Sequence, residues 1–141
     1  MNYIGIDLSW SQNNFSGVAL LQDNRVKYVD VIKDMDDIVS FVLNYPTAKV
    51  GVDAPLYVPN ISGNREIEKS FLRDFSAKKL GVYPVNRTLL EKVNGYISGE
   101  SLDSFIPQKL GYNLFEVYPH ATIMQCFHGK VLPYQRKKVE I

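Results

Sequence analysis

Short apolar runs separated by polar turns dominate the first third of the chain. The runs at residues 3–6, 15–21 and 25–32 have the length and the content of β-branched and aromatic residues that are typical of strands. Asp23-Asn24, between the second and third runs, is a favoured turn pair. Because consecutive strands joined by short connections usually pair with each other, the opening predicts three antiparallel strands.

A helix and a fourth strand are predicted next. The spacing i, i+3 and i+4, which gives a helix one apolar face, is shared by Ile38, Phe41 and Val42. Asp34 precedes them and is predicted to cap the helix. Residues 49–52 then form a short strand that leads directly into Asp53. The order strand, helix, strand predicts a crossover that places the fourth strand parallel to a neighbour.

The second half of the chain is less regular and shows no internal repeat. The pattern predicts a loop at 54–63, helices at 65–75, 88–97 and 121–127, an irregular segment at 99–111, and a fifth strand at 114–117. Strands and helices alternate, and 141 residues is about the size of one domain. The sequence therefore predicts one α/β domain that spans residues 1–141.

Composition supports an ordered globule and limits the class of partner. Hydrophobic residues make up 45% of the chain and charged residues 22%, which is ordinary for a folded domain. The net charge is only +1, whereas proteins that grip duplex nucleic acid usually carry a clear basic excess. Basic residues do cluster locally, at Lys78-Lys79 and Arg136-Lys137-Lys138, so a small phosphate-binding patch stays open.

Cys126 is the single cysteine, which excludes an internal disulfide and a zinc site built on several cysteines. A lone cysteine suits a reducing compartment. The N-terminal residues lack the pattern of a signal peptide, and no apolar stretch approaches the roughly 18 residues of a membrane-spanning helix. We therefore expect a cytoplasmic protein that does not partner with membranes.

Two carboxylates occupy matching places in the predicted fold. Asp7 ends the first strand and Asp53 follows the fourth. Catalytic groups in open α/β sheets gather at the carboxyl ends of strands, so the two would lie side by side if their strands are neighbours. Two such carboxylates repel unless a positive charge lies between them, and Mg²⁺ or Mn²⁺ fits oxygen ligands of this kind. Glu116, near the end of the fifth strand, is the candidate third carboxylate.

Each acid also has a purely structural interpretation. An aspartate after a strand is often a turn former or a helix cap, and we weigh that role evenly for Asp7 or Asp53 taken alone. Glu116 alone is equally explained as an ion-pair partner of Arg65, Arg73 or Arg87. The matching contexts of the two aspartates favour a shared site, which has the chemistry of metal-assisted phosphodiester cleavage.

Four other residues are candidates for contact with a substrate. Arg65 and Arg73 can bind phosphate, although ion pairs with nearby acids explain them at least as well. His120 can move protons or bind metal, and a capping or half-buried structural role is the alternative we favour. Trp10, in the polar loop after Asp7, can stack on a base or anchor the loop.

The chain resembles the domain-of-unknown-function family 429, whose members are described as predicted nucleases with a ribonuclease H fold. The likeness is carried by Gly5-Ile6-Asp7, Val50-Gly51-Val52-Asp53-Ala54-Pro55-Leu56, the segment 65–73, and Glu116-Val117-Tyr118-Pro119-His120-Ala121. The second and fourth segments are specific when they occur together in this order. The first is weak alone, because actin-like ATPases and sugar kinases begin in a similar way.

The resemblance implies a ribonuclease H-like domain with a mixed five-stranded sheet, in which three antiparallel strands precede two parallel ones. With it we expect helices on both faces and catalytic, metal-binding acids at Asp7, Asp53 and Glu116. Arg65 and His120 match motif positions whose roles are open. Nucleases of this fold usually carry a further acid on a C-terminal helix, and here Glu140 is the sole acid of the tail. Either the chain is a fragment of a longer protein or its site is incomplete.

Two functions compete. The first is a metal-dependent nuclease, in which Asp7, Asp53 and Glu116 hold Mg²⁺ or Mn²⁺. The second is a non-catalytic binding or assembly module that keeps the fold. The acidic residues favour the enzyme, while the near-neutral charge and the short tail favour the module. A nucleotide-binding fragment of the actin-like type is weakened, because no glycine-rich phosphate loop is present. For either function, we expect exposed apolar surface that promotes homo-oligomers.

Overall fold

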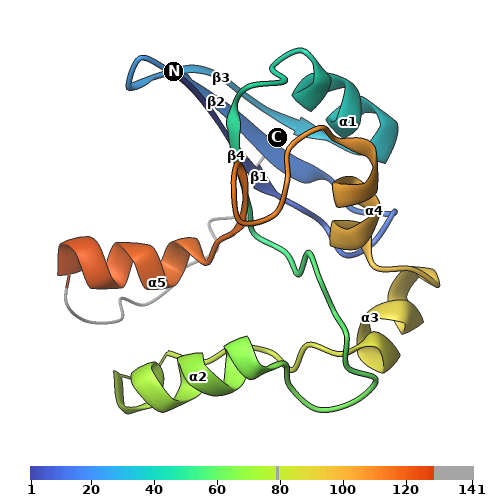
Figure 1. Cartoon of the computed structure of the whole chain (residues 1–141), viewed down its shortest axis with the longest axis vertical. Coiled ribbons are helices and arrows are strands. Elements are labelled where there is room, and N and C mark those ends of the chain that lie inside the picture. Colours follow the sequence, from blue (N-terminus) through green and yellow to red (C-terminus); the bar gives the residue numbers. More distant parts are fainter. Residues whose placement is uncertain (79, 129–141) are drawn as a thin grey trace, which may run out of the picture.

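The chain forms a mixed α/β fold around one five-stranded sheet (Figure 1). The structure is a computed structural model that describes residues 1–78 and 80–128. Lys79, the basic residues 136–138 and Glu140, all singled out from the sequence, lie outside the described residues.

The sheet has the strand order β3-β2-β1-β4-β5. The strands are β1 (Asn2–Asp7), β2 (Ser16–Gln22), β3 (Arg25–Ile32), β4 (Lys49–Val52) and β5 (Leu114–Glu116). The first three pair antiparallel, and β4 pairs parallel with both β1 and β5. This confirms the prediction of three antiparallel strands followed by two parallel ones.

Five α-helices accompany the sheet in the described part of the chain. They are α1 (Met35–Leu43), α2 (Glu66–Phe75), α3 (Arg87–Asn94), α4 (Ser98–Phe105) and α5 (Pro119–Ile123). A 3₁₀ turn (Ser76–Lys78) follows α2, and a π-helical turn (Met124–His128) follows α5. Gly95, with a φ of 75°, ends α3 in the left-handed region that glycine tolerates best.

The prediction of an irregular segment at 99–111 was wrong over most of its length, because α4 occupies residues 98–105. Its glycine and serines obscured the helical pattern, but burial of Leu102 and of Ile106 just beyond the helix holds it against the core. Tertiary packing therefore overrides weak local propensity here. Asp34 does precede α1, but its backbone carbonyl, and not its side chain, accepts the capping hydrogen bonds from Asp37 and Ile38.

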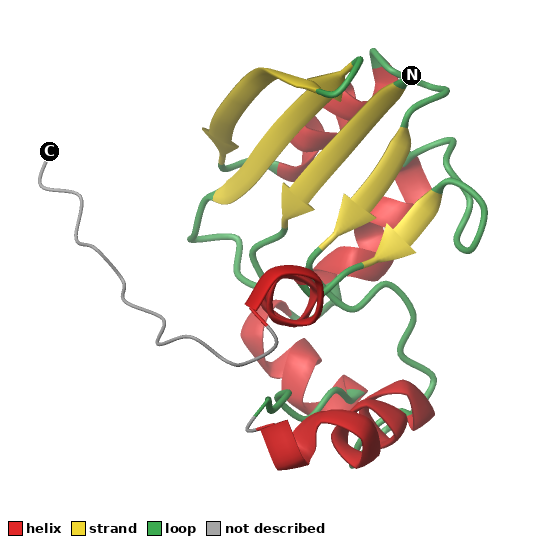
Figure 2. Ribbon diagram, turned by 90° about the vertical axis from the view of Figure 1, so that its left-hand side faces the viewer, coloured by secondary structure: helices red, strands yellow, loops and turns green. Residues whose placement is uncertain are grey.

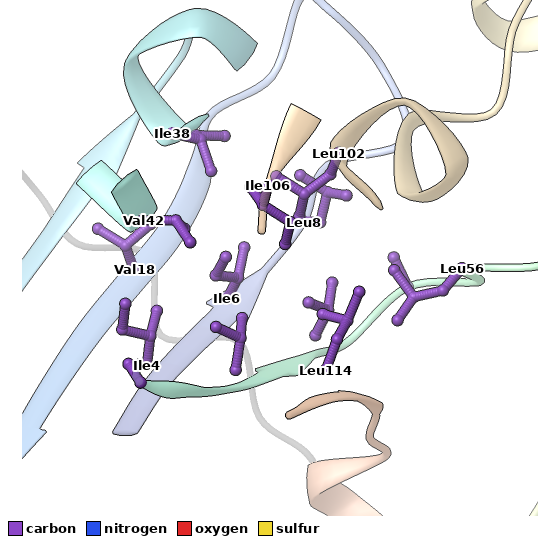
Figure 3. Close-up of a cluster of buried hydrophobic side chains, with 14 of the residues drawn as sticks. Ile4, Ile6, Leu8, Val18, Ile38, Val42, Leu56, Leu102, Ile106 and Leu114 are labelled. Atoms are coloured by element: carbon purple, nitrogen blue, oxygen red, sulfur yellow. The ribbon is translucent and has the colours of Figure 1, made fainter. Parts of the chain in front are cut away.

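One face of the sheet carries the core (Figure 3). Because side chains alternate between the faces of a strand, every second residue of the central strands is buried on this face. These strand residues are Ile4, Ile6, Val18, Leu20, Val50, Val52 and Leu114. Helices α1 and α4 cover them, through buried residues such as Ile38 and Leu102.

The other face of the sheet is turned toward the viewer in Figure 2, and no described helix lies across it. Tyr3, Val29, Val31 and Phe115 are exposed there. The expectation of helices on both faces is therefore not met within the described residues. The reason is that the remaining helices lie beyond the end of the sheet and not over this face (Figures 1 and 2). Apolar side chains gather on this uncovered face.

Helices α2 and α3 lie beyond the carboxyl ends of the parallel strands (Figure 1). A second, smaller apolar cluster packs this part of the chain, formed by Val58, Val85, Leu90 and Ile97.

Among the described residues, no helix has the length and apolar character needed to cross a membrane.

Gly99 lets α4 approach the loop that follows β4 very closely. A Cβ atom at this position would lie 1.8 Å from the carbonyl oxygen of Pro55 and 2.7 Å from its carbonyl carbon. Both atoms belong to the backbone, so neither can move without shifting the loop itself. This contact holds the segment just after Asp53 against the core helix.

We expect Gly99→Ala to destabilise the fold by about 2–3 kcal/mol, because the added methyl group displaces backbone that carries Asp53. Urea unfolding monitored by circular dichroism measures the change. Gly5→Ala is the control, since a Cβ at that strand position meets no heavy atom within 4 Å. Equal stabilities for the two variants would contradict this account of the α4 contact.

Candidate active site

Asp7 and Asp53 lie side by side at the carboxyl end of the sheet. Strands β1 and β4 are parallel neighbours, and their last paired residues are Ile6 and Val52. Asp7 is the last residue of β1, and Asp53 is the first residue after β4. The Asp53 N–H donates to the carbonyl oxygen of Ile6 at 2.8 Å, which continues the pairing past the end of β4. The two strands are neighbours, which is the condition under which the sequence predicts that the two aspartates lie side by side.

The two aspartates also share a face. Ile6 and Val52 are buried under α1 and α4, so alternation directs the residues that follow them toward the uncovered face. Gly17 is paired with Asp7 on β2, and a Cβ at Gly17 would lie 3.7 Å from the Asp7 Cβ, which is an ordinary van der Waals contact. Asp7 is exposed and Asp53 is half-buried.

Asp53 is under electrostatic strain. Burial, then the charge of Asp7, then the charge of Glu116, raise the pKa of the Asp53 carboxyl above its ordinary value of 3.8. Within the described residues, no hydrogen bond to this carboxylate compensates for the burial. The ionised form of Asp53 is therefore disfavoured unless a cation approaches it.

Glu116 ends β5 but its carboxylate has different partners. It pairs in register with Val52, whose side chain is on the covered face, so alternation directs Glu116 away from Asp7. One carboxylate oxygen, Oε2, accepts hydrogen bonds from the Leu56 N–H at 3.2 Å and from Arg65 Nη1 at 3.0 Å. The other, Oε1, is bonded to Arg65 Nη2. The ion-pair interpretation of Glu116 is thus the one observed.

Arg65 uses all five of its N–H donors in this arrangement. Nε donates to Glu68 at 2.9 Å, Nη1 donates to the Tyr57 carbonyl at 2.9 Å and to Glu116, and Nη2 donates to both glutamates. Burial alone would lower the pKa of the Arg65 guanidinium, but the bonds to Glu116 and Glu68 raise it overall. Arg65 is 8% exposed, so it has neither a free donor nor an open face for a phosphate.

A second arginine holds the same loop in the same way. Arg87 Nη1 donates to the Val58 carbonyl at 2.8 Å and to Glu100 at 2.9 Å, and the Val58 N–H donates to Glu100 at 3.1 Å. Each arginine therefore binds a backbone carbonyl of this loop, and also the carboxylate that accepts a hydrogen bond from a backbone N–H of the same loop. The loop that follows Asp53 is thus held in place by two ion-pair networks. The network of Arg65 is buried, and that of Arg87 is half-buried.

A cavity of about 590 Å³ opens beside the acid pair. Asp53, Arg65, Glu68 and Glu116 provide its polar lining. Most of the remaining wall is apolar or aromatic and includes Trp10, Ile67, Phe71, Val85, Tyr83 and Tyr118. The Tyr118 hydroxyl donates to the Gly81 carbonyl at 3.0 Å, and its ring packs on Phe71 with 5.4 Å between ring centroids. Such a mixture of apolar wall and few polar groups is typical of small-ligand sites.

The remaining predicted substrate residues stand outside this cavity. Arg73 is exposed on α2 and donates to the Ser70 hydroxyl at 2.9 Å. His120, in the first turn of α5, lies edge-on to Tyr118 with 6.2 Å between ring centroids. Neither residue lines the cavity. The structure brings Asp53, Glu116 and Arg65 to it, together with Trp10.

Within residues 1–78 and 80–128, no three histidine, cysteine, aspartate or glutamate side chains are grouped so that they can hold a metal ion together. Asp7 and Asp53 form a pair, and Glu116 is committed to Arg65. Three aromatic lining residues, Phe71, Tyr83 and Tyr118, were not identified as functional from the sequence. Their spacing carries no periodic signal, because they come from a helix, a loop and the short connection between β5 and α5.

Comparison of the chain with known protein families, with curated proteins and with solved structures found no match.

We expect Asp53→Asn to raise the melting temperature by roughly 1–3 °C at pH 7 in metal-free buffer. A raised pKa means that the folded state holds the Asp53 proton more tightly than the unfolded state does. The ionised carboxylate thus costs stability above its raised pKa, and this cost disappears as the pH falls toward 3.8. The gain should shrink over that range in a series of thermal melts.

Asp74→Asn, which removes an exposed carboxylate on α2, controls for the loss of one negative charge. A melting temperature of Asp53→Asn below that of the natural chain at pH 7 would show that Asp53 is a structural cap and not a strained acid.

We expect Arg65→Ala to cost about 3–5 kcal/mol, because it leaves Glu68 and Glu116 without their cation. Arg65→Lys should recover only part of the loss, since lysine lacks the planar fork that reaches both carboxylates and the Tyr57 carbonyl. Arg73→Ala, at an exposed position of the helix that Arg65 precedes, should change stability by less than about 0.5 kcal/mol. Chemical unfolding of the three variants gives the comparison, and similar losses at both arginines would overturn it.

Proposed function

We propose that this chain is a metal-dependent phosphodiesterase that acts on nucleic acid, with Asp7 and Asp53 as its central acids. The observation that carries the proposal is the pairing of these two carboxylates on adjacent parallel strands at the carboxyl end of the sheet. Ligands in open α/β sheets bind at this end. A cytoplasmic location, inferred from the single cysteine, belongs to the same proposal.

We further propose that the domain is ribonuclease H-like and related to the family it resembles. The strand order β3-β2-β1-β4-β5, with an antiparallel meander joined to two parallel strands, supports this assignment. So does the position of Asp7, Asp53 and Glu116 at the ends of β1, β4 and β5, which are neighbours in the sheet.

The two aspartates fit a divalent cation. Asp53 has a raised pKa, caused by burial and by two neighbouring carboxylates, and lacks a compensating hydrogen bond within the described residues. Asp7 is exposed and shares its face. A bound Mg²⁺ or Mn²⁺ would neutralise the pair and supply Lewis-acid chemistry for phosphodiester hydrolysis. Glu116 fits less well, because both of its oxygens already accept hydrogen bonds.

The chain's own residues would divide the work between them. Asp7 and Asp53 would hold the cation and, with it, the substrate phosphate at the carboxyl end of the sheet. Arg65 neutralises Glu116 and Glu68, and so limits the negative charge that an incoming phosphate meets. The apolar wall of the adjacent cavity excludes water from one side of the reacting centre.

The alternative is a non-catalytic binding or assembly module. The commitment of Glu116 to Arg65 favours it, since two free acids bind a hard cation more weakly than three. The exposed apolar side chains of the uncovered sheet face also suit assembly, including formation of homo-oligomers. Under this alternative the acids remain, but no hydrolysis follows.

We expect weak binding of Mn²⁺ or Mg²⁺ and slow cleavage of an oligonucleotide. Metal should raise the melting temperature of the natural chain, because a ligand stabilises the state that binds it. Asp7→Asn and Asp53→Asn should abolish this rise, and Asp7→Asn should reduce cleavage to the background without enzyme. Calorimetry, thermal melts and a gel-based cleavage assay with each metal provide the measurements.

Asp74→Asn is again the matched control, because its carboxylate is exposed on α2 and outside the acid pair. Its metal-induced shift and its cleavage rate should equal those of the natural chain. Metal binding without any cleavage would favour the binding module. Cleavage that persists in Asp7→Asn would exclude the proposed site.

A further inference from the structure

We propose that the cavity beside the acid pair receives an unpaired nucleobase, which makes single-stranded nucleic acid the substrate class of this site. The inference rests on the proposed function, because it takes the phosphate beside Asp7 and Asp53 as given. It adds that a base of the bound nucleic acid enters the cavity, and that a single strand can place a base there more readily than a duplex can.

The walls of the cavity have the chemistry of a stacking platform. Trp10, Phe71, Tyr83 and Tyr118 all line it. Trp10 is 37% exposed and Tyr83 is 82% exposed, so large aromatic faces stand open to solvent at the rim. A flat heterocycle that covers such faces gains stacking and removes apolar surface from water. Bases of any sequence offer such a face.

The polar lining of the cavity accepts hydrogen bonds more readily than it donates them. Asp53 and Glu116 present carboxylate oxygens, and the Asp53 carboxylate has no hydrogen-bond partner in the part of the chain that the structure describes. The exocyclic amino groups of adenine, cytosine and guanine are donors that suit such oxygens. A base with an amino group therefore supplies a hydrogen-bond donor to the Asp53 carboxylate.

A phosphate fits the same cavity poorly. Arg65 is the cation of its lining, and all five of its N–H donors are already used by Glu68, Glu116 and the Tyr57 carbonyl. Three carboxylates against one guanidinium leave the lining negative, which repels an anion. The cavity thus selects the uncharged part of a nucleotide.

The position of the cavity beside the acid pair favours binding of single-stranded nucleic acid over binding of a duplex. Asp53 belongs to both, whereas Asp7 stands outside the cavity. A phosphate beside the two aspartates would have the base of an adjoining nucleotide within reach of Tyr83 and Trp10. In a duplex that base is stacked and paired, and extruding it costs free energy that a single strand does not spend. Single strands should therefore bind more tightly.

The chain carries its own reporter, because Trp10 is the single tryptophan. We would titrate the Asp7→Asn variant, which prevents cleavage and leaves the cavity lining intact, with an adenine-rich single-stranded octanucleotide in the presence of chelator. Saturable quenching of tryptophan fluorescence is expected, because the base stacks beside Trp10. The same strand in a duplex should need at least about 10-fold higher concentration for half-quenching.

Tyr83→Ala should weaken binding of the single strand roughly 5- to 150-fold, the range that alanine substitution gives at stacking platforms. Tyr83→Phe should retain it, since the ring is kept. Tyr112→Ala is the matched control, because Tyr112 is 81% exposed, as Tyr83 is, but lies outside the cavity. Binding should also depend only weakly on salt, because few phosphates are neutralised by basic side chains.

The outcomes separate this inference from the proposed function. Equal quenching by duplex and single strand, absence of saturable quenching up to about 1 mM, or equal effects of Tyr83→Ala and Tyr112→Ala would overturn the base cavity, even where metal-dependent cleavage is found. Quenching that depends on Tyr83 in a chain that cleaves nothing with Mg²⁺ or Mn²⁺ would support the cavity and defeat the phosphodiesterase.

Discussion

The guanidinium of Arg65 joins three parts of the chain that no common apolar core connects. It bonds Glu68 in α2, Glu116 at the end of β5 and the Tyr57 carbonyl in the loop after β4. Helix α2 lies beyond the sheet (Figure 1), and the main core is built from the strands with α1 and α4. The ion pairs and hydrogen bonds of Arg65 therefore hold α2 in place, whereas burial of apolar side chains holds α1 in place. Such a junction holds only while every partner is present, because a buried carboxylate left without its cation is strongly destabilising.

Strand alternation divides three acids that the sequence places in equivalent positions. Asp7 and Asp53 each follow a buried residue, so both face the uncovered side of the sheet, whereas Glu116 is in register with buried Val52 and turns toward Arg65. A shift of one residue in β5 would turn Glu116 to the face of Asp7 and Asp53, since the side-chain period of a strand is two. The result is a pair of neighbouring carboxylates, in which burial and the nearby charges raise the pKa of Asp53, and one neutralised glutamate. The pair is suited to binding a cation, and the glutamate stabilises the fold through its ion pair with Arg65.

The sheet could be predicted because its signals are local. Apolar runs bounded by turns gave all five strands to within about two residues, and the helix between β3 and β4 forced the parallel pairing that sets Asp7 beside Asp53. Helix α4 was not predicted, because its serines and glycine give no clear helical pattern of apolar residues. The burial of Leu102 depends on tertiary packing. The use of all five Arg65 N–H donors within the protein was also not predicted. Its i, i+3 relation to Glu68 is visible in the sequence, but Glu116 is 51 residues away and the Tyr57 contact is to a backbone carbonyl.

Electrostatics explain how a chain with a net charge of +1 can still suit a polyanionic substrate. At the carboxyl end of the sheet four carboxylates meet one saturated arginine, so the protein alone repels phosphate there. Any attraction for phosphate at this point has to come from a cation held by Asp7 and Asp53, and the remaining affinity has to come from uncharged contacts such as those of the aromatic cavity wall. Recognition by stacking and a site that depends on metal are thus two consequences of the same local charge balance, because Arg65, the arginine of the cavity lining, is already used to hold the fold.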